Sequence, residues 1–438
     1  MWLSNRHGLL GIFFAFGIGV TPLAAAVQAE GQPAEKPAAQ NTCLVCHSHL
    51  GGQLASPTGP FPTDVHAEKG LTCASCHGGD PTSMDIRVAM NPARGFRGRP
   101  SRQEIPAFCG RCHSNADYMH RFNPTAKTDQ VAQYNTSVHG KRLREGDRRV
   151  AVCINCHSVH DIKMVNDPTS PVYPTNVPDT CGKCHSDREY MQGYNLPNLS
   201  QVEDYQNSVH YRALTVEGNL AAPTCQSCHG SHGATPPGVT SVADVCGTCH
   251  AHNRDLFEKS PHRDAFASLG APGCVQCHSN HAIQPAGEHM LVGPGSICLT
   301  CHAPDDNGGQ RAQEMAASIQ KLDSTIQQTR DTLEQAERAG VDMSLAMSEL
   351  TNAHSRLVMA RTTVHSLDST KVAAETTGGL RIASEIAEEG KQKLAELRRF
   401  REGLALSTVF ILGVVLTLYF YIRQNGYLRK EPGGETDE

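Results

Sequence analysis

One short pattern, Cys-x-x-Cys-His, constrains this chain more than any other feature, because it occurs nine times in 438 residues. The nine copies begin at Cys43, Cys73, Cys109, Cys153, Cys181, Cys225, Cys246, Cys274 and Cys298. Each copy uses two cysteines, so together they account for all 18 cysteines of the sequence. No thiol is left over for a disulfide or for a cysteine nucleophile.

The pattern is the one that covalent haem attachment requires. Two thiols two residues apart can add to the two vinyl groups of one haem, and the adjacent imidazole can bind the iron. Cys-x-x-Cys pairs also build tetrahedral zinc sites. Only 23 residues are histidine, so a histidine directly after all nine pairs favours haem over zinc. The sequence therefore predicts nine covalently bound haem c groups.

Each motif assigns three residues to its haem. The predicted thioether residues are Cys43, Cys46, Cys73, Cys76, Cys109, Cys112, Cys153, Cys156, Cys181, Cys184, Cys225, Cys228, Cys246, Cys249, Cys274, Cys277, Cys298 and Cys301. The predicted proximal iron ligands are His47, His77, His113, His157, His185, His229, His250, His278 and His302.

Residues 43–302 offer little polypeptide for nine macrocycles, which themselves supply apolar surface for burial. We therefore expect a mostly irregular or short-helical haem domain with little β structure, without a large side-chain core. The formal net charge of −5 omits the haem propionates, so the loaded protein is more acidic still. Nucleic acid is excluded as an expected partner.

An internal repeat emerges when the remaining histidines are aligned. A module reads aromatic-x-x-Ser-x-His (the lead-in), then Cys-x-x-Cys-His-x-x-His (the first motif with its trailing histidine), then Cys-x-x-Cys-His (the second motif). Complete copies begin at Tyr134, Tyr205 and Phe257. The earliest copy is degenerate: His66 precedes Cys73, and Asp80 stands where the trailing histidine is expected. Four two-haem modules and the lone Cys43 motif make nine.

The lead-in and trailing histidines are predicted to fill the sixth position of the irons. They are His66, His139, His160, His210, His232, His262 and His281. Four more histidines lie outside the repeat, and for them iron ligation competes with a solvated loop position: His49, His120, His252 and His289. Thioether ligation by Met119, Met164 or Met290 is a less favoured alternative, because imidazoles are in surplus.

Three stretches carry a family resemblance: the Tyr-x-x-Ser-Val-His lead-in, the stretch from Cys153 to His160 followed by Cys181–His185, and the stretch from Cys274 to His302. They resemble the multihaem c-type cytochromes with doubled Cys-x-x-Cys-His motifs, over roughly residues 66–302. The resemblance implies closely stacked, low-potential bis-histidine haems acting as an electron wire. It also implies that a histidine on a trailing helix can cap a haem, which makes His365 a further distal candidate.

The N-terminal region reads as an export signal. Residues 1–29 contain Arg6, an apolar core and a small-residue cleavage site at Val27-Gln28-Ala29, as in a secretory signal peptide. An uncleaved anchor is the alternative. Residues 30–42 are rich in Ala, Pro, Gln and Glu and are expected to be a flexible leader before the haem domain, residues 43–302.

After the haem domain the composition changes. Residues 303–309 are expected to be a linker, and residues 310–402, which lack cysteine and proline, two or three long helices. Met315, Ile319, Leu322, Ile326 and Leu333 form one apolar seam. Gly340 is expected to end the first helix, and Asp342 to cap a second helix that buries Leu345, Leu350, His354 and Leu357. Gly378-Gly379 is expected to interrupt the chain again. This segment could act as a stalk, a brace or a homo-oligomer contact.

Residues 403–422 carry no charge and are long enough to cross a membrane as one helix. A buried helix of a soluble protein is the alternative. Because haem c is attached outside the cytoplasm, the N-terminal side is expected at the periplasmic face of the inner membrane, with residues 423–438 as a cytoplasmic tail.

The sequence thus favours a single-pass, periplasmic electron carrier of anaerobic respiration over an enzyme with its own substrate. The expected partners are the membrane and redox proteins, with a quinol-linked membrane donor and a periplasmic or outer-membrane acceptor. The alternative is a multihaem reductase of nitrite, hydroxylamine or a sulfur oxyanion with one open haem. A lysine-ended Cys-x-x-Cys-Lys motif is absent, and the imperfect first module at Asp80 is the expected place for such a haem.

Overall fold

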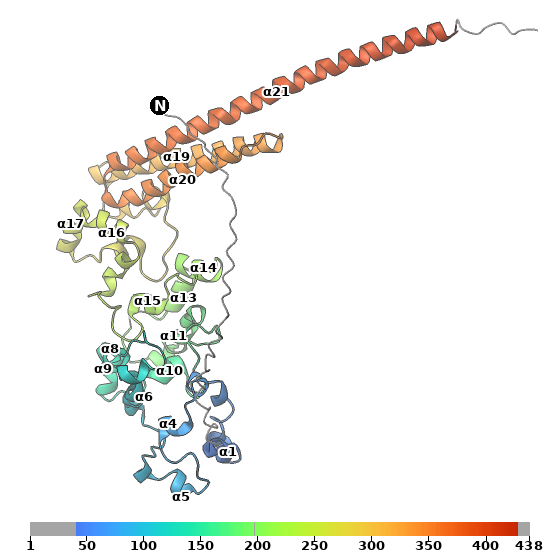
Figure 1. Cartoon of the computed structure of the whole chain (residues 1–438). Helices are drawn as coiled ribbons and strands as arrows, with labels where there is room; N and C mark the ends of the chain where they lie inside the picture. Colours follow the sequence, from blue (N-terminus) through green and yellow to red (C-terminus); the bar gives the residue numbers. More distant parts are fainter. Residues whose placement is uncertain (1–40, 197, 428–438) are drawn as a thin grey trace, which may run out of the picture. The chain divides into compact units, whose positions relative to one another are not determined.

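The computed structural model describes residues 41–196 and 198–427 (Figure 1). The predicted signal peptide and the predicted leader up to residue 40 lie outside the described residues, as does the predicted tail from residue 428. Within the described ranges the chain contains short helices, three long helices and no β-strand. The predicted fold class is confirmed.

Contacts divide the chain into two compact units, whose limits differ from the domain limits expected from the sequence. Unit 1 comprises Met1–Gly59 with Leu71–Gly98, and unit 2 comprises Pro60–Gly70 with Arg99–Glu438. The helices of unit 1 are α1 (Thr42–Ser48), α2 (Gly52–Ala55), α4 (Cys73–His77), α5 (Ile86–Ala89) and η2 (Pro92–Arg94). Two of the nine motifs therefore belong to unit 1 and seven to unit 2.

In unit 2 the motifs lie on α6 (Ile105–His113), α10 (Cys153–His157), α11 (Val177–His185), α15 (Cys225–His229), η5 (Val242–Thr248), α18 (Cys274–His278) and η7 (Cys298–Thr300). The connecting helices are η1 (Phe61–Thr63), α3 (Val65–Glu68), η3 (Arg102–Glu104), α7 (Ala116–Met119), α8 (Gln130–Thr136), α9 (Val138–Arg144), η4 (Pro174–Asn176), α12 (Arg188–Met191), α13 (Gln201–Gln206), α14 (Val209–Thr215), α16 (Ala251–Glu258), α17 (Pro261–Leu269) and η6 (Glu288–Met290).

First motifs and second motifs of a module have different local structures. Every first motif is a single helical turn that begins at its first cysteine and is followed by a residue with positive φ, namely Gly78 (68°), Ser158 (64°), Gly230 (80°) or Ser279 (59°). This left-handed residue ends the helix at the motif histidine and turns the chain sharply. The second motifs on α6 and α11 instead end longer helices.

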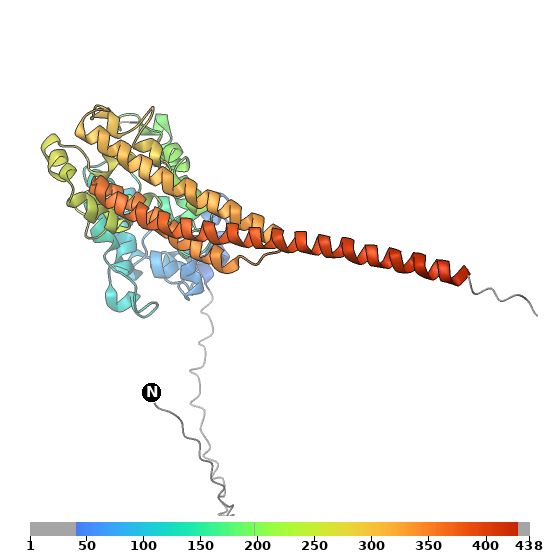
Figure 2. The same cartoon turned by 90° about the horizontal axis from the view of Figure 1, so that it is seen from above.

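The three long helices pack together as a bundle. They are α19 (Asn307–Arg338), α20 (Ser344–Thr363) and α21 (Ser369–Tyr427), and η8 (Val364–Ser366) follows α20. Both views show them side by side (Figures 1 and 2). Met315, Ile319, Leu322, Ile326 and Leu333 are at most 3% exposed and form the core of the bundle. The apolar seam predicted for the first helix is confirmed.

Three details of the predicted helices are wrong. The chain does not break at Gly378-Gly379, because α21 runs through both glycines. A side chain at Gly379 would come within 2.7 Å of a methyl group of Leu322, so this glycine lets α21 approach α19 closely. That packing outweighs a glycine's helix penalty of about 1 kcal/mol. Leu345 and His354, expected on the buried face of α20, are exposed, and Ala346 and Ala353 are buried in their place.

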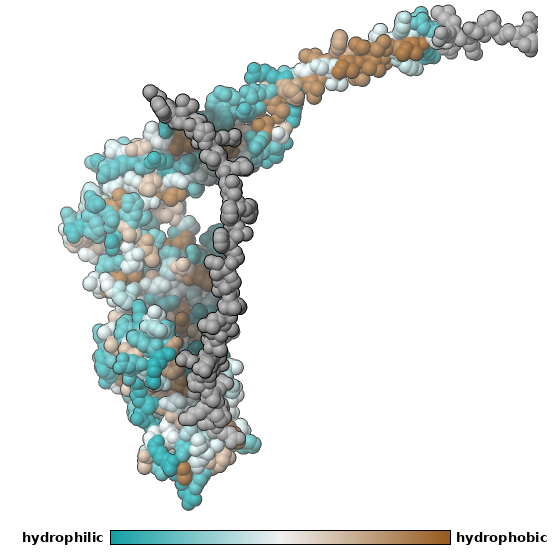
Figure 3. Space-filling view, in the orientation of Figure 1, coloured by the Kyte–Doolittle hydropathy of each residue, from teal (hydrophilic) through white to brown (hydrophobic). Residues whose placement is uncertain are grey.

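The C-terminal half of α21 extends beyond the bundle. It contains an 18-residue window with a mean hydropathy of 2.2, none of which is buried. Figure 3 shows this stretch as a continuous hydrophobic surface near the end of the helix. By length and composition the helix is a candidate membrane span.

Stability of the bundle can be tested with two leucines of α20. Leu350→Ala is expected to lower the free energy of unfolding by about 2–5 kcal/mol, because Leu350 is fully packed and its removal leaves a cavity. Leu345→Ala is the matched control, since its side chain is 72% exposed. Chemical denaturation of the full-length protein, followed by helical circular dichroism, measures both. Equal effects of the two changes would contradict this packing.

Candidate haem-binding sites

Seven motif histidines of unit 2 each face a second histidine. The ring centroids lie 5.9 to 6.3 Å apart in the pairs His113–His66, His185–His139, His157–His232, His250–His210, His229–His281, His302–His262 and His278–His365. Each pair combines a predicted proximal ligand with a predicted distal candidate. Every motif histidine of unit 2 is included.

The separation suits one metal ion between the two rings. Two metal–nitrogen bonds of about 2 Å each, added to the half-widths of two imidazoles, place the centroids roughly 6 Å apart. Rings that simply pack on each other change their separation with their tilt. Here the separation stays within a narrow range while the angle between the rings varies from 13° to 85°. The residues therefore fit a haem iron held between paired imidazoles.

The pairs follow a fixed register. Each lead-in histidine faces the second motif of its own module, as in His139–His185. A trailing histidine faces the first motif of the preceding module, as in His232–His157 and His281–His229. The first motif of the fourth module has no module after it, and its His278 faces His365 of η8 instead. The trailing histidines thus connect successive modules.

The serine and the tyrosine of the lead-in each make a hydrogen bond that positions the lead-in histidine. The Ser137 hydroxyl accepts a hydrogen bond from Gly140 N at 3.0 Å and so caps α9, which carries His139. Tyr134 Oη donates to Ala151 O at 2.8 Å, two residues before Cys153. Tyr205 makes the same bond to Pro223 O at 2.9 Å, two residues before Cys225. The tyrosine and the serine therefore fix the lead-in histidine relative to the first motif.

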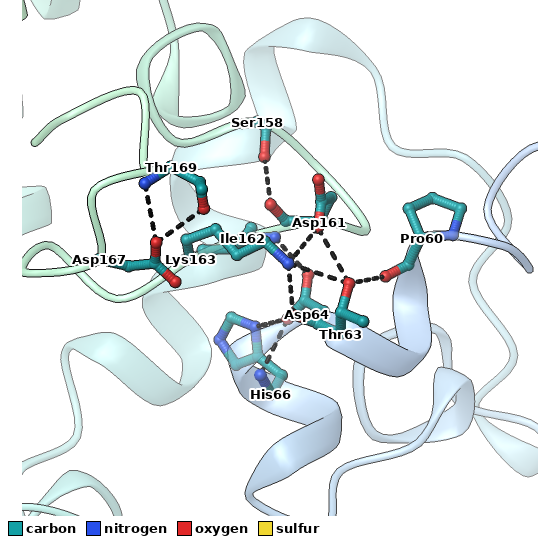
Figure 4. A network of polar contacts seen from close by, with 10 residues as sticks. All are labelled: Pro60, Thr63, Asp64, His66, Ser158, Asp161, Ile162, Lys163, Asp167 and Thr169. Atoms are coloured by element: carbon teal, nitrogen blue, oxygen red, sulfur yellow. Dashed lines mark hydrogen bonds and ion pairs between the residues drawn. The ribbon is translucent and has the colours of Figure 1, made fainter. Parts of the chain in front are cut away.

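Asp64 has the serine's role in the degenerate first module (Figure 4). Its Oδ1 accepts from His66 N at 2.8 Å and contacts His66 Nδ1 at 2.9 Å, while Oδ2 accepts from Ile162 N at 2.7 Å. A carboxylate on Nδ1 orients the ring and leaves Nε2 for iron. Asp64 was missed in the sequence, although it stands two residues before His66, as Ser137 does before His139.

The bond from Asp64 to Ile162 shows how a trailing loop attaches to the preceding module. Val65 N donates to Ile162 O at 2.8 Å, next to the Asp64 contact. Val209 N donates to Ile283 O at 2.9 Å in the same way. Both isoleucines lie two residues after a trailing histidine. Backbone bonding between a trailing loop and an earlier lead-in therefore recurs along the repeat.

His365 is held at the helical bundle in an orientation that suits ligation. Its Nδ1 lies 2.8 Å from Thr362 O, which leaves Nε2 directed elsewhere. The neighbouring Arg361 pairs with Glu288 and with Asp323 of α19, both at 3.0 Å. Burial lowers the pKa of His365 and of His278, so both imidazoles are favoured in the neutral form that binds metal. Burial has the same effect on the pKa of His113, His139, His157, His185 and His229.

The motifs of unit 2 contact one another in chain order. The nearby thiol of Cys109 lowers the pKa of Cys153, the thiol of Cys225 raises the pKa of Cys181, and the thiol of Cys274 raises the pKa of Cys246. Each of these pairs combines the second motif of one module with the first motif of the next. Within a module the second cysteines are close: burial raises the pKa of Cys156, and the charges of Cys153 and Cys184 raise it further. The helices α6, α10, α11, α15, η5 and α18 are likewise in contact in succession.

The candidates outside the repeat, other than His365, are not brought to a motif histidine. His49, His120, His252 and His289 are exposed, and none of their rings contacts another histidine within the described ranges. His49 and His120 bond to Val45 O and Ala126 O. Met164 is likewise exposed. No cluster of three or more His, Cys, Asp or Glu residues that could hold a metal ion occurs in the part of the chain described.

Comparison with known proteins gives two family matches. Residues 65–186 match the family described as cytochrome c3, and residues 245–328 match the family described as cytochrome c554 and c-prime. The chain is 24% identical over 244 residues to the multiheme cytochrome MtrA of Shewanella baltica, covering 53% of this chain and 59% of the relative. The chain thus spans little more than half of that relative's length. No solved structure matches the chain.

The Asp64 network yields a stability prediction. Asp64→Ala is expected to lower the free energy of unfolding by about 1–3 kcal/mol, because the backbone N–H groups of His66 and Ile162 lose a charged acceptor that is 2% exposed. Asp161→Ala is the control, since Asp161 pairs with Lys163 at the surface and an exposed pair contributes at most about 1 kcal/mol. Chemical denaturation followed at the Soret band compares the two variants. A larger loss in the control would contradict the structural role of Asp64.

Proposed function

The chain is a multihaem c-type cytochrome, and from that premise we propose that it relays electrons along nine covalently bound haems. The observation that carries the proposal is the succession of contacts between motif-bearing helices in unit 2, from α6 to α18. Such an order brings neighbouring haems together without a gap.

The residues of the chain position the haems and adjust their properties. Bound haem iron supplies one-electron redox chemistry. The cysteine pairs would fix each macrocycle to a short helix, and the motif histidine would bind its iron. The second histidine of each pair would bind the same iron, which would keep substrates from binding. The Tyr, Ser and Asp contacts of the lead-ins hold these second histidines still.

We assign the distal role to His66, His139, His210, His232, His262, His281 and His365 from the geometry of their pairs. His160 holds the repeat position of His232 and His281, and the register assigns it to the first motif of the preceding module. Eight haems then have two histidine ligands each, and the haem of Cys43 is the one to which no second histidine is assigned.

We further propose that the protein is anchored by residues 403–422, with the haems on the periplasmic face of the inner membrane. The proposal is supported by the apolar, fully exposed end of α21 and by the attachment of haem c outside the cytoplasm. The donor is then a quinol-linked membrane partner, and the acceptor a periplasmic or outer-membrane protein. The apolar seams of residues 310–402 are used within the chain's own bundle.

Haem content and redox titration test the relay. Purified full-length protein is expected to contain nine irons per chain and to take up nine electrons in overlapping one-electron steps. The measurements are iron analysis by mass and a potentiometric titration of the haem absorbance. Protein that is colourless, or that exchanges only one or two electrons, would end the proposal.

The role of His365 has its own test. His365→Ala is expected to convert one low-spin haem per chain to high spin, because His278 loses the imidazole that faces it. His354→Ala is the matched control on the same helical hairpin, since His354 is exposed. Paramagnetic resonance of the oxidised protein counts high-spin centres in both variants. An unchanged spectrum of the His365 variant would remove His365 from the ligand set.

A further inference from the structure

The first motif differs from the other motifs in the surroundings of its histidine. His47 has its Nδ1 3.0 Å from Leu54 O, which leaves Nε2 for iron. No other imidazole ring contacts His47 among the described residues, whereas all seven motif histidines of unit 2 have a partner. Nearby His49 points its Nδ1 back to Val45 O of the same helix at 2.7 Å.

The register of the repeat explains the difference. A first motif receives its distal ligand from the trailing position of the following module, as His157 does from His232. For the Cys43 motif, the following module is the degenerate one, and its trailing position is residue 80. That residue is an aspartate. The degeneracy at Asp80 therefore affects the haem of Cys43 and not the haem of its own motif.

The loop that carries Asp80 lies beside the Cys43 motif. Thr42 N and Oγ1 both donate to Pro81 O, at 2.9 and 2.8 Å, and Thr42 Oγ1 also lies 2.9 Å from Ser83 O. Burial raises the pKa of Cys43, and the charges of Cys73 and Asp80 add to this effect. The trailing loop is thus attached beside this motif as the repeat requires, but it carries no imidazole.

The Asp80 carboxylate is already engaged. Its Oδ2 pairs with Arg94 at 2.6 Å, and its Oδ1 accepts from Thr82 N at 3.0 Å and from Thr82 Oγ1 at 2.7 Å. These contacts hold the side chain within its own loop. A carboxylate fixed in this way does not replace a distal histidine.

The alternative register leads to the same result. If the Cys43 motif is instead a second motif, its ligand is a lead-in histidine upstream, and residues 8–42 contain no histidine. The one histidine further upstream, His7, falls in the predicted signal peptide.

We infer that the haem of Cys43, Cys46 and His47 keeps an open sixth position and binds a small inorganic ligand there. Water or hydroxide is the expected ligand of the ferric iron, and a diatomic gas that of the ferrous iron. The inference rests on the proposed haem loading. The contact of α1 with α4, together with the 3.5 Å approach of Asn41 Nδ2 to Cys73 Sγ, connects this open site to its neighbouring motif.

The inference is tested by counting the haems with an open sixth position in full-length protein, before and after the haem of Cys43 is removed. Wild-type protein is expected to show one high-spin ferric haem by paramagnetic resonance and to bind one carbon monoxide per chain when reduced. The double change Cys43→Ala with Cys46→Ala removes this haem and should abolish both signals. Added imidazole should convert the wild-type high-spin signal to low spin with a stoichiometry of one.

Asp80→His tests the register directly. The new imidazole is expected to convert the high-spin haem to low spin and to reduce carbon monoxide binding at least tenfold. Asp80→Asn is the matched control, because it also breaks the Arg94 pair but supplies no imidazole, and it should retain the high-spin signal. Imidazole titration of wild-type protein supplies the same ligand without a mutation, should the Asp80→His variant not fold.

Two results would overturn the inference: nine low-spin haems in wild-type protein, or a high-spin signal that survives removal of Cys43 and Cys46. The first result leaves the electron relay intact. A failure of haem loading, measured independently by iron content, would instead remove both proposals.

Discussion

The pairing of two imidazoles at the distance of a shared metal is the interaction on which the part of unit 2 that precedes the helical bundle depends. Side-chain packing alone gives this region little cohesion, because its largest apolar cluster consists of Ile105, Leu143, Val150 and Val152 with a few partly buried neighbours. An iron held by His157 and His232 would join parts of the chain that share no long helix or sheet. Loss of a ligand would therefore loosen a module junction as well as alter a haem.

The two motif types give the repeat its direction. The left-handed residue after each first motif, such as Ser158, sends the trailing histidine to the preceding module. The second motif is served by the lead-in of its own module, as His185 is by His139. In this register each module offers one histidine to its own second motif and one to the first motif of the preceding module. The first motif of the last module therefore needs a histidine from outside the repeat, and the Cys43 motif depends on the trailing position of the first module. His365 is that histidine for His278, and residue 80 leaves the position at His47 without an imidazole.

The helical bundle has two separate roles in this arrangement. Its core is ordinary close packing of Leu322, Leu333, Leu350 and their neighbours, and it would form without iron. Its contact with the haem region is made by η8, where His365 faces His278, by α20, where Arg361 pairs with Glu288, and by α19, which contacts η6 and η7. The far end of α21 is apolar and exposed, so one continuous helix includes both the packed part and the candidate membrane span.

The amino-acid order by itself determined what depends on neighbours in the chain: the Cys-x-x-Cys-His motifs, the module pattern, the first apolar seam and the apolar end of α21. It identified His365 as a candidate through resemblance alone, and it did not distinguish His365 from His252 or His289. Local patterns also gave three wrong details: the break at Gly378-Gly379, where close packing of α21 on α19 decides the outcome, and the burial of Leu345 and His354, whose places on the buried face are taken by Ala346 and Ala353. Only the tertiary structure decided which imidazole faces which, since the partners lie far apart in sequence and meet through loop attachment. It likewise placed the loop that carries Asp80 beside the Cys43 motif, where Thr42 donates to Pro81 O.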